Sequence, residues 1–134
     1  MSEPTAPIGI IGGTGFGRIA ELGDAQSIDV ETEYGQPSCA LRLGELAGTG
    51  VAFLARHGSP HRIAPHRVNS RANIAALKSV GVREILAITA VGGIAAWARA
   101  GALAIPDQLI DYTHGRLSSF SDHGERAVEH IDFS

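Results

Sequence analysis

Residues 8–17 read IGIIGGTGFG, a short apolar run that leads directly into a glycine-rich turn. The continuous run Ile8–Ile11, ended by glycines, predicts a strand that is covered on both faces of a sheet. Thr14 supplies the hydroxyl group of the turn. We therefore expect a buried strand that presents a hydroxyl group just beyond its carboxyl end.

Two further apolar runs end in polar, cationic or small residues. Arg56-His57-Gly58 follows residues 51–55, and Thr89-Ala90-Val91-Gly92-Gly93 follows residues 85–88. In an open α/β sheet, ligands bind outside the carboxyl ends of the strands. Arginine forms paired, charge-assisted bonds to phosphate oxygens, and the amides of a glycine-rich turn can line an anion-binding concavity. The three strand ends together predict an anion cradle, with inorganic phosphate as the favoured ligand.

The composition bounds the class of protein. The 134 residues are one domain's worth of chain, and 44% hydrophobic with 19% charged residues is typical of a globular protein. A net charge of −3 does not favour a nucleic-acid surface. The single cysteine, Cys39, cannot form an internal disulfide, which favours a reducing cytoplasm. We see no signal peptide and no apolar stretch long enough to cross a membrane.

The periodicity predicts an α/β fold in which strands flank one helix. Segment 27–31 alternates as a half-exposed strand, and the segments 39–46 and 49–55 predict a hairpin. A stripe of small residues predicts a helix over 66–80, with Arg71 largely outside the stripe. A second buried strand is expected over 84–90. We further expect a turn and then a strand over Gln108–Asp111. Residues 112–129 are rich in charge and predict an exposed or ligand-covering loop.

Other interpretations of the glycine-rich turn remain. A nucleotide P-loop requires a Gly-Lys-Ser/Thr ending, and this turn contains no lysine. A dinucleotide-binding reductase would use Gly12 and Gly15, with Asp29 or Glu31 at the ribose. Its third glycine would fall at Arg18, where a bulky side chain obstructs close packing of helix against strand. A structural turn without a ligand is the third possibility.

A metal site is not expected at the histidines of residues 57–66. His57 and His61 have the spacing of zinc ligands on a helix, and His66 lies nearby. Gly58 and Pro60 interrupt any helix between the first two, and the neighbouring arginines disfavour a cation.

Taken together, the motifs resemble those of the trimeric purine nucleoside phosphorylase and methylthioadenosine phosphorylase family. The resemblance covers residues 8–134, and within the family it is strongest to bacterial S-methyl-5'-thioinosine phosphorylases. The motifs that carry it are Gly12–Gly15, Arg56–Gly58 with His61, Val68–Asn73, Thr89–Ile94, Gln108–Tyr112 and His130–Ser134.

The resemblance implies a fold, a reaction and a site. The fold would be a three-layer α/β arrangement around a mixed, mostly parallel central sheet. The reaction would convert S-methyl-5'-thioinosine and phosphate to hypoxanthine and 5-methylthioribose 1-phosphate, with methylthioadenosine or another purine nucleoside as alternative substrates. Phosphate is a co-substrate, and neither a cofactor nor a metal is implied. The implied phosphate-binding residues are Thr14, Arg56, His57, Thr89 and Ala90. The family also implies a homotrimer in which His130 covers the 5' end of a nucleoside bound to a neighbouring subunit.

The resemblance extends over the N-terminal half of the family's domain only. Residues 1–134 would then be the N-terminal part of a single domain whose C-terminal half is absent. The residue that protonates the purine would lie beyond Ser134. An inactive truncated remnant is therefore a further hypothesis. No nucleic-acid or membrane partner is expected.

Overall fold

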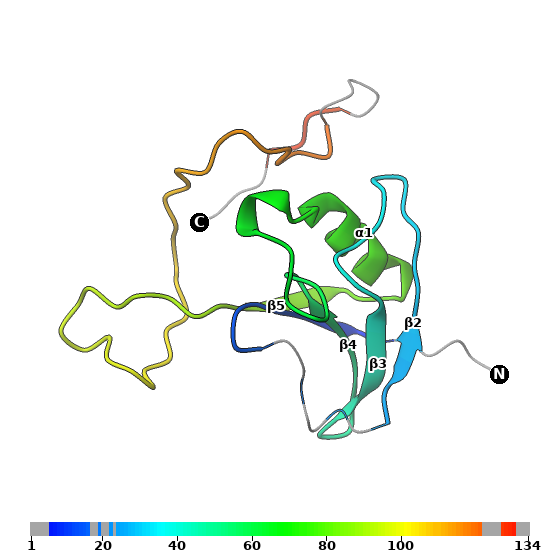
Figure 1. The fold of residues 1–134 in the computed structure, drawn as a ribbon, viewed down its shortest axis with the longest axis horizontal. Coiled ribbons are helices and arrows are strands. Elements are labelled where there is room, and N and C mark those ends of the chain that lie inside the picture. Colours follow the sequence, from blue (N-terminus) through cyan, green and yellow to red (C-terminus); the bar gives the residue numbers. More distant parts are fainter. Residues whose placement is uncertain (1–5, 17–18, 20–21, 23, 122–126, 131–134) are drawn as a thin grey trace. The chain divides into compact units, whose positions relative to one another are not determined.

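The structure is a computed structural model, and it describes residues 6–16, 19, 22, 24–121 and 127–130. Arg18, which bears on the dinucleotide hypothesis, and residues 131–134 of the last family motif lie outside the described residues. The chain divides into two compact units, residues 1–90 and residues 91–134. Figure 1 shows that the described helices and strands belong to the first unit.

A five-stranded mixed sheet forms the centre of the first unit. Its strands are β1 (Ile8–Gly12), β2 (Gln26–Ile28), β3 (Leu41–Leu46), β4 (Thr49–Ala55) and β5 (Glu84–Ile88). They lie in the order β2-β3-β4-β1-β5 (Figure 1). The antiparallel pairs β2–β3 and β3–β4 lie at one side, and β1 pairs in parallel with both β4 and β5. The sequence prediction of a mixed sheet in an α/β fold is confirmed.

Apolar side chains pack on both faces of this sheet. One cluster joins strands β3 and β4 to the helix and contains Leu41, Leu54 and Leu77. The other lies on the opposite faces of β1 and β4 and contains Ile10 and Phe53. Because successive side chains of a strand point to opposite faces, a strand between two clusters must be apolar throughout. The continuous apolar run of β1 is thereby explained.

Helix α1 (Ser70–Ser79) begins later than the sequence analysis predicts. Segment Pro65–Arg67 forms a separate short 3₁₀ helix, η2, and the helix proper starts where the Asn69 side chain accepts a hydrogen bond from the Ala72 amide. The predicted start at His66 is wrong because an asparagine cap, which a periodicity argument does not weigh, sets the helix boundary. The structure also buries Arg71, which the pattern places outside the apolar stripe. Its guanidinium lies 5.3 Å from the centre of the Tyr34 ring.

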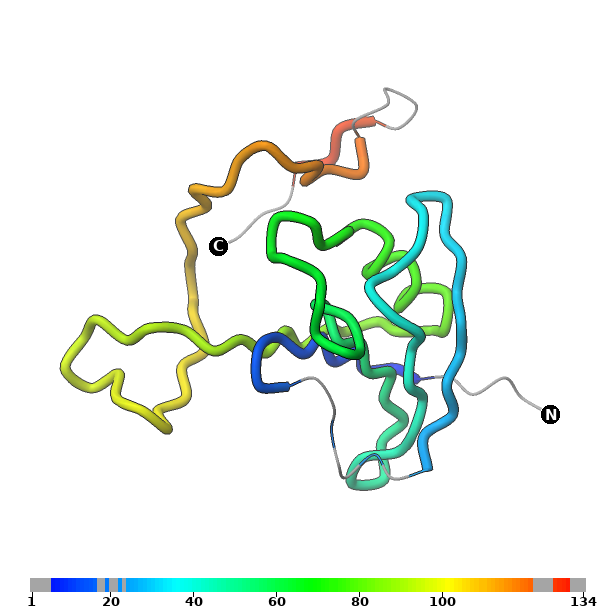
Figure 2. Tube along the Cα trace, in the orientation of Figure 1, coloured from blue at the N-terminus to red at the C-terminus, as the bar shows by residue number. Residues whose placement is uncertain are grey.

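The helix holds the turn at residues 34–38. Asn69 Nδ2 donates to the Tyr34 carbonyl at 2.7 Å. Asn73 Oδ1 accepts from the Ser38 amide at 2.8 Å, and its Nδ2 donates to Ser38 Oγ at 3.0 Å. Figure 2 shows the chain passing from this turn into β3 beside the helix. The two asparagines fasten this segment to α1.

Strand β5 is exposed, whereas the sequence analysis predicts a buried strand over 84–90. It ends at Ile88, and Leu86 keeps 55% of its surface exposed. The strand lies at the edge of the sheet, beside β1. An apolar run indicates that side chains tend to be buried, but elements must pack against the strand to bury them. The described residues of the first unit leave most of β5 uncovered.

The second unit contains no helix or strand among residues 91–121 and 127–130. The predicted strand over Gln108–Asp111 is therefore wrong. Leu109 and Ile110 are largely exposed, so no sheet face stabilises an extended pairing there. The Asp111 carboxylate instead closes a local turn, since it accepts hydrogen bonds from the amide and the hydroxyl of Thr113. Across the described part of the chain, no helix has both the length and the apolar character that crossing a membrane requires.

Candidate functional site

The carboxyl ends of β1, β4 and β5 lie at the same level of the sheet. Gly12 is in register with Ala55 on one side and with Ile88 on the other. Two hydrogen bonds continue this pairing just beyond the strands, from the Arg56 amide to the Gly12 carbonyl and from the Gly13 amide to the Ile88 carbonyl. The three predicted turns are thus brought to one edge of the sheet.

The Arg56 side chain joins two of these turns. Its Nη2 donates a hydrogen bond to Thr89 Oγ1 at 2.8 Å, and its Nε donates to His57 Nε2 at 3.2 Å. Both acceptors are neutral groups. No ion pair of Arg56 with a carboxylate is found within the described residues, so its positive charge is held in place without being neutralised there. This arrangement is what an anion site requires.

Gly13 makes room for the guanidinium. A Cβ atom built at Gly13 would lie 2.6 Å from Arg56 Nη2 and 2.9 Å from the Ile88 carbonyl oxygen. Any side chain at this position would push the guanidinium out of its place. The second glycine of the turn therefore has a steric function next to Arg56, which the sequence analysis does not identify. The adjacent pair Gly12-Gly13 is the signal that such a function leaves in the sequence.

His57 is buried, with 5% of its surface exposed. Its Nδ1 lies 2.8 Å from the Ile63 carbonyl oxygen, and a carbonyl can only accept, so Nδ1 is the donor. Its ring also lies against that of His61, with the centroids 4.6 Å apart. Both nitrogens of the imidazole are thus engaged by the protein itself. Ile63, which the sequence analysis does not single out, takes part through its backbone alone.

Thr14 and Ala90 flank these contacts in the sequence. Thr14 follows Gly13 in the exposed turn after β1, and Gly15 completes that turn with a φ of 84°, a conformation that favours glycine. Ala90 follows Thr89 and is also exposed. Thr89 Oγ1 accepts from Arg56, and its contact with the Ala90 carbonyl is long, at 3.5 Å. The Thr89 hydroxyl hydrogen is therefore available to an anion beside Arg56.

His130, the remaining predicted site residue, belongs to the second unit and is exposed. Among the described residues no group of three or more histidine, cysteine or acidic side chains could hold a metal ion.

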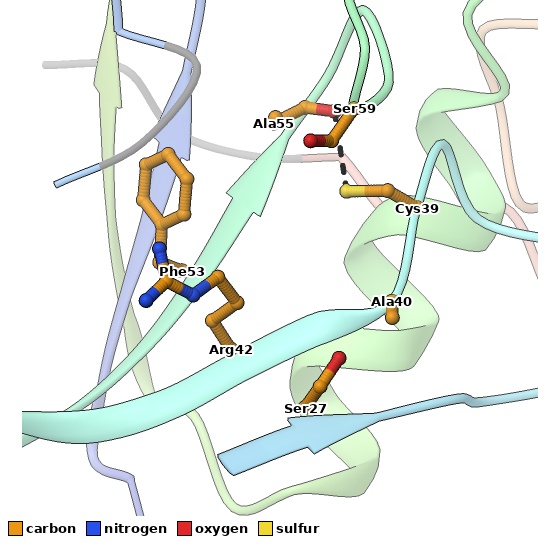
Figure 3. Close-up of a pocket in the computed structure, with 7 residues that line it drawn as sticks. All are labelled: Ser27, Cys39, Ala40, Arg42, Phe53, Ala55 and Ser59. Atoms are coloured by element: carbon orange, nitrogen blue, oxygen red, sulfur yellow. Dashed lines mark hydrogen bonds between the residues drawn. The ribbon is translucent and has the colours of Figure 1, made fainter. Parts of the chain in front are cut away.

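A separate hollow of about 330 Å³ opens beside the end of β4, and none of the predicted site residues lines it. Figure 3 shows Cys39 in its wall. The Cys39 thiol donates a hydrogen bond to the Ala55 carbonyl, and the two atoms lie 3.5 Å apart. Partial burial raises the pKa of the Cys39 thiol, and the hydrogen bond opposes that shift. The hollow is lined by Ser27, Cys39, Ala40, Arg42, Phe53, Ala55 and Ser59.

A mixed α/β sheet with a cationic site at the carboxyl ends of its parallel strands defines a class of anion-binding α/β proteins. Within that class, the sequence signature of the Phosphorylase superfamily matches residues 7–134. The chain belongs to this family, and the resemblance noted from its motifs is confirmed.

Curated proteins of similar sequence are named as nucleoside phosphorylases. A protein of Xanthomonas campestris pv. campestris named "Probable S-methyl-5'-thioinosine phosphorylase" is 49% identical over 133 residues, which are 99% of this chain and 53% of that protein. A purine nucleoside phosphorylase of Streptomyces coelicolor is 50% identical over 117 residues, which are 87% of this chain and 41% of that protein. The chain spans about half the length of the curated relatives that it matches.

Solved structures agree with this assignment. The crystal structure of a methylthioadenosine phosphorylase from an antarctic soil metagenomic library has a TM-score of 0.57 and 50% sequence identity. The match covers 63% of this chain and 29% of that one. The predicted nucleoside phosphorylase-like fold is confirmed over the matched part.

Proposed function

We propose that the protein carries out phosphorolysis of a purine nucleoside, with S-methyl-5'-thioinosine as the favoured substrate. Phosphate and this nucleoside would give hypoxanthine and 5-methylthioribose 1-phosphate. The proposal is supported by relatives with these names and by membership in the Phosphorylase superfamily. The structural observation that carries it is the Arg56 guanidinium, which two neutral acceptors hold at the edge where three parallel strands end.

Thr14, Arg56, His57, Thr89 and Ala90 form the phosphate site in this proposal. Cleavage of a glycosidic bond passes through a transition state that resembles an oxocarbenium ion. A phosphate fixed beside the sugar supplies the nucleophile in the correct position and places negative charge near the developing positive charge. Arg56 lowers the cost of bringing the phosphate dianion into the site, and the Thr14 and Thr89 hydroxyls provide neutral donors.

The remaining parts of the proposal concern assembly and the 5' end of the nucleoside. We propose a homotrimer in which His130 covers the 5' end of a nucleoside held by a neighbouring subunit. An apolar methylthio group would favour a neutral imidazole there over a charged side chain. Phosphate is the co-substrate, and the reaction as proposed uses neither a metal nor an organic cofactor.

The test is phosphate-dependent release of purine by the purified protein. Release of hypoxanthine from S-methyl-5'-thioinosine should saturate with phosphate and stop in its absence. S-methyl-5'-thioadenosine and inosine serve as competing substrates and rank the alternatives. Binding of inorganic phosphate, measured by calorimetry, tests the site without any turnover. A protein that binds phosphate but never turns over would correspond to the inactive remnant.

A matched pair of variants tests the site residue. Arg56→Ala should weaken phosphate binding by about tenfold or more, since hydrogen bonds to charged groups are among the stronger ones. Arg83→Ala makes the same change at an exposed arginine directly before β5, at the other end of that strand from Thr89, and should leave phosphate binding unchanged. Unchanged phosphate saturation in Arg56→Ala would remove Arg56 from the site. Binding of NAD or NADP in place of phosphate would favour the dinucleotide alternative.

A further inference from the structure

The hydrogen bonds of His57 determine its protonation. The Nε–H of Arg56 is always a donor, so the His57 Nε2 that lies 3.2 Å from it must present a lone pair. The opposite nitrogen, Nδ1, faces the carbonyl oxygen of Ile63 at 2.8 Å and must carry the hydrogen. An imidazolium cation would direct an N–H at the N–H of Arg56. The arrangement therefore requires the neutral ring with its hydrogen on Nδ1.

The loop that follows His57 holds the ring in this position. The backbone carbonyl of His57 accepts hydrogen bonds from the amides of Arg62 and Ile63, each at 2.8 Å. The imidazole closes the same loop from the other side through the Ile63 carbonyl, and the His61 ring lies against it. The side chain is thus a buried anchor with little freedom to turn toward a ligand.

The anchored ring controls which part of the guanidinium faces an anion. A guanidinium has five N–H donors, and His57 takes the one on Nε while Thr89 takes one on Nη2. The other three donors lie on the terminal Nη atoms and have no partner among the described residues. Because Nε is occupied, an anion must approach the two terminal nitrogens.

We propose that His57 is a positioning residue, which acts on phosphate through Arg56 and not through its own ring. Its unprotonated Nε2 fixes the guanidinium so that the terminal nitrogens meet the anion end-on. Gly13 closes the space on the side of Nη2, and Thr89 fixes the same nitrogen. This inference rests on the proposed phosphate site and assigns His57 a function within it.

Two substitutions at position 57 separate the two hydrogen bonds of the ring. The amide oxygen of His57→Gln can reach the position of Nε2 and accept from Arg56. The amide nitrogen of His57→Asn can reach the position of Nδ1 and donate to Ile63, but it leaves Arg56 Nε without its acceptor. Calorimetry with inorganic phosphate should show near-normal binding by His57→Gln and binding weaker by about tenfold for His57→Asn.

A double-mutant cycle tests whether His57 acts through Arg56. In an Arg56→Leu background, His57→Asn should cause no further loss of phosphate binding, because the group that it positions is gone. Equal losses from His57→Asn in both backgrounds would show that the imidazole binds phosphate directly and would overturn the proposal. Equal losses for His57→Gln and His57→Asn in the native background would overturn it as well.

Nitrogen NMR of the unaltered protein gives a readout that does not depend on the variants. With phosphate bound, His57 should show a hydrogen on Nδ1 and none on Nε2. A hydrogen on Nε2 would contradict the inference. Failure of the unaltered protein to bind phosphate would instead overturn the proposed phosphate site. The two failures are distinguishable, because this one is seen before any substitution is made at His57.

Discussion

Replacement of Gly13 by alanine tests the geometry of the site with the addition of one methyl group. The new Cβ would lie 2.6 Å from Arg56 Nη2, well inside van der Waals contact, and 2.9 Å from the Ile88 carbonyl oxygen. Gly13 does not have a positive φ, so the substitution adds bulk without backbone strain. The backbone oxygen belongs to the sheet and is the harder of the two to move. We therefore expect the guanidinium to withdraw.

The size of the effect follows from the bond that is lost. Withdrawal breaks the 2.8 Å hydrogen bond from Arg56 Nη2 to Thr89 Oγ1 and displaces the donors that would meet an anion. A hydrogen bond to a charged group contributes about 1.5–3 kcal/mol, which corresponds to roughly 10- to 150-fold weaker phosphate binding. Calorimetric titration with inorganic phosphate measures the change, and thermal unfolding checks that the protein stays folded.

Arg83→Ala is the control. It changes an exposed residue directly before β5, at the other end of that strand from Thr89, and leaves Gly13 and Arg56 unaltered. Its phosphate affinity should equal that of the unaltered protein. If Gly13→Ala remains folded and binds phosphate as tightly as Arg83→Ala, the guanidinium does not occupy the place that the structure gives it.

Two further predictions concern hydrogen bonds outside the site. Asn73→Ala should lower the free energy of unfolding by about 1–3 kcal/mol in urea titrations, because it leaves the backbone amide of Ser38 without its buried acceptor. The control is Lys78→Ala at an exposed position of the same helix, which should change the free energy of unfolding little. The Thr113 hydroxyl and amide hold the pKa of Asp111 below its ordinary value. Thr113→Val removes the hydroxyl contribution, so carbon NMR should show the pKa of Asp111 rising toward that of a free aspartate, and no change would exclude this hydrogen bond in solution.

The convergence of the strand ends was predictable from the sequence. Parallel strands bring their carboxyl ends to one edge, and three apolar runs end in Thr14, Arg56 and Thr89. The Arg56–Thr89 hydrogen bond joins residues 33 positions apart and agrees with that expectation. The strand limits were predicted to within a few residues, because the alternation of β3, the continuous apolar run of β4 and the glycines after β1 are local signals.

The errors arose where burial depends on distant parts of the chain. The pattern of β5 indicates a tendency to be buried, but whether Leu86 is covered depends on what packs against the edge of the sheet. Residues 108–111 have the composition of a strand, yet pairing requires a partner that the described part of the second unit does not supply. Arg71 was misplaced because its charge argues for solvent, whereas contact with the Tyr34 ring offsets part of the cost of burial.

The role inferred for His57 shows why residue type alone does not define a binding site. A histidine next to an arginine at a strand end predicts two ligands for one anion, and nothing in the sequence opposes that interpretation. Its ring nitrogens, however, meet a neighbouring side chain and a backbone carbonyl six residues away, and neither contact has a sequence signature. Every residue type has a backbone carbonyl that can accept this hydrogen bond, so the identity of residue Ile63 gives motif analysis no signal. The contribution of such a histidine is orientation of the charge beside it, and only the hydrogen-bond pattern distinguishes that from direct binding.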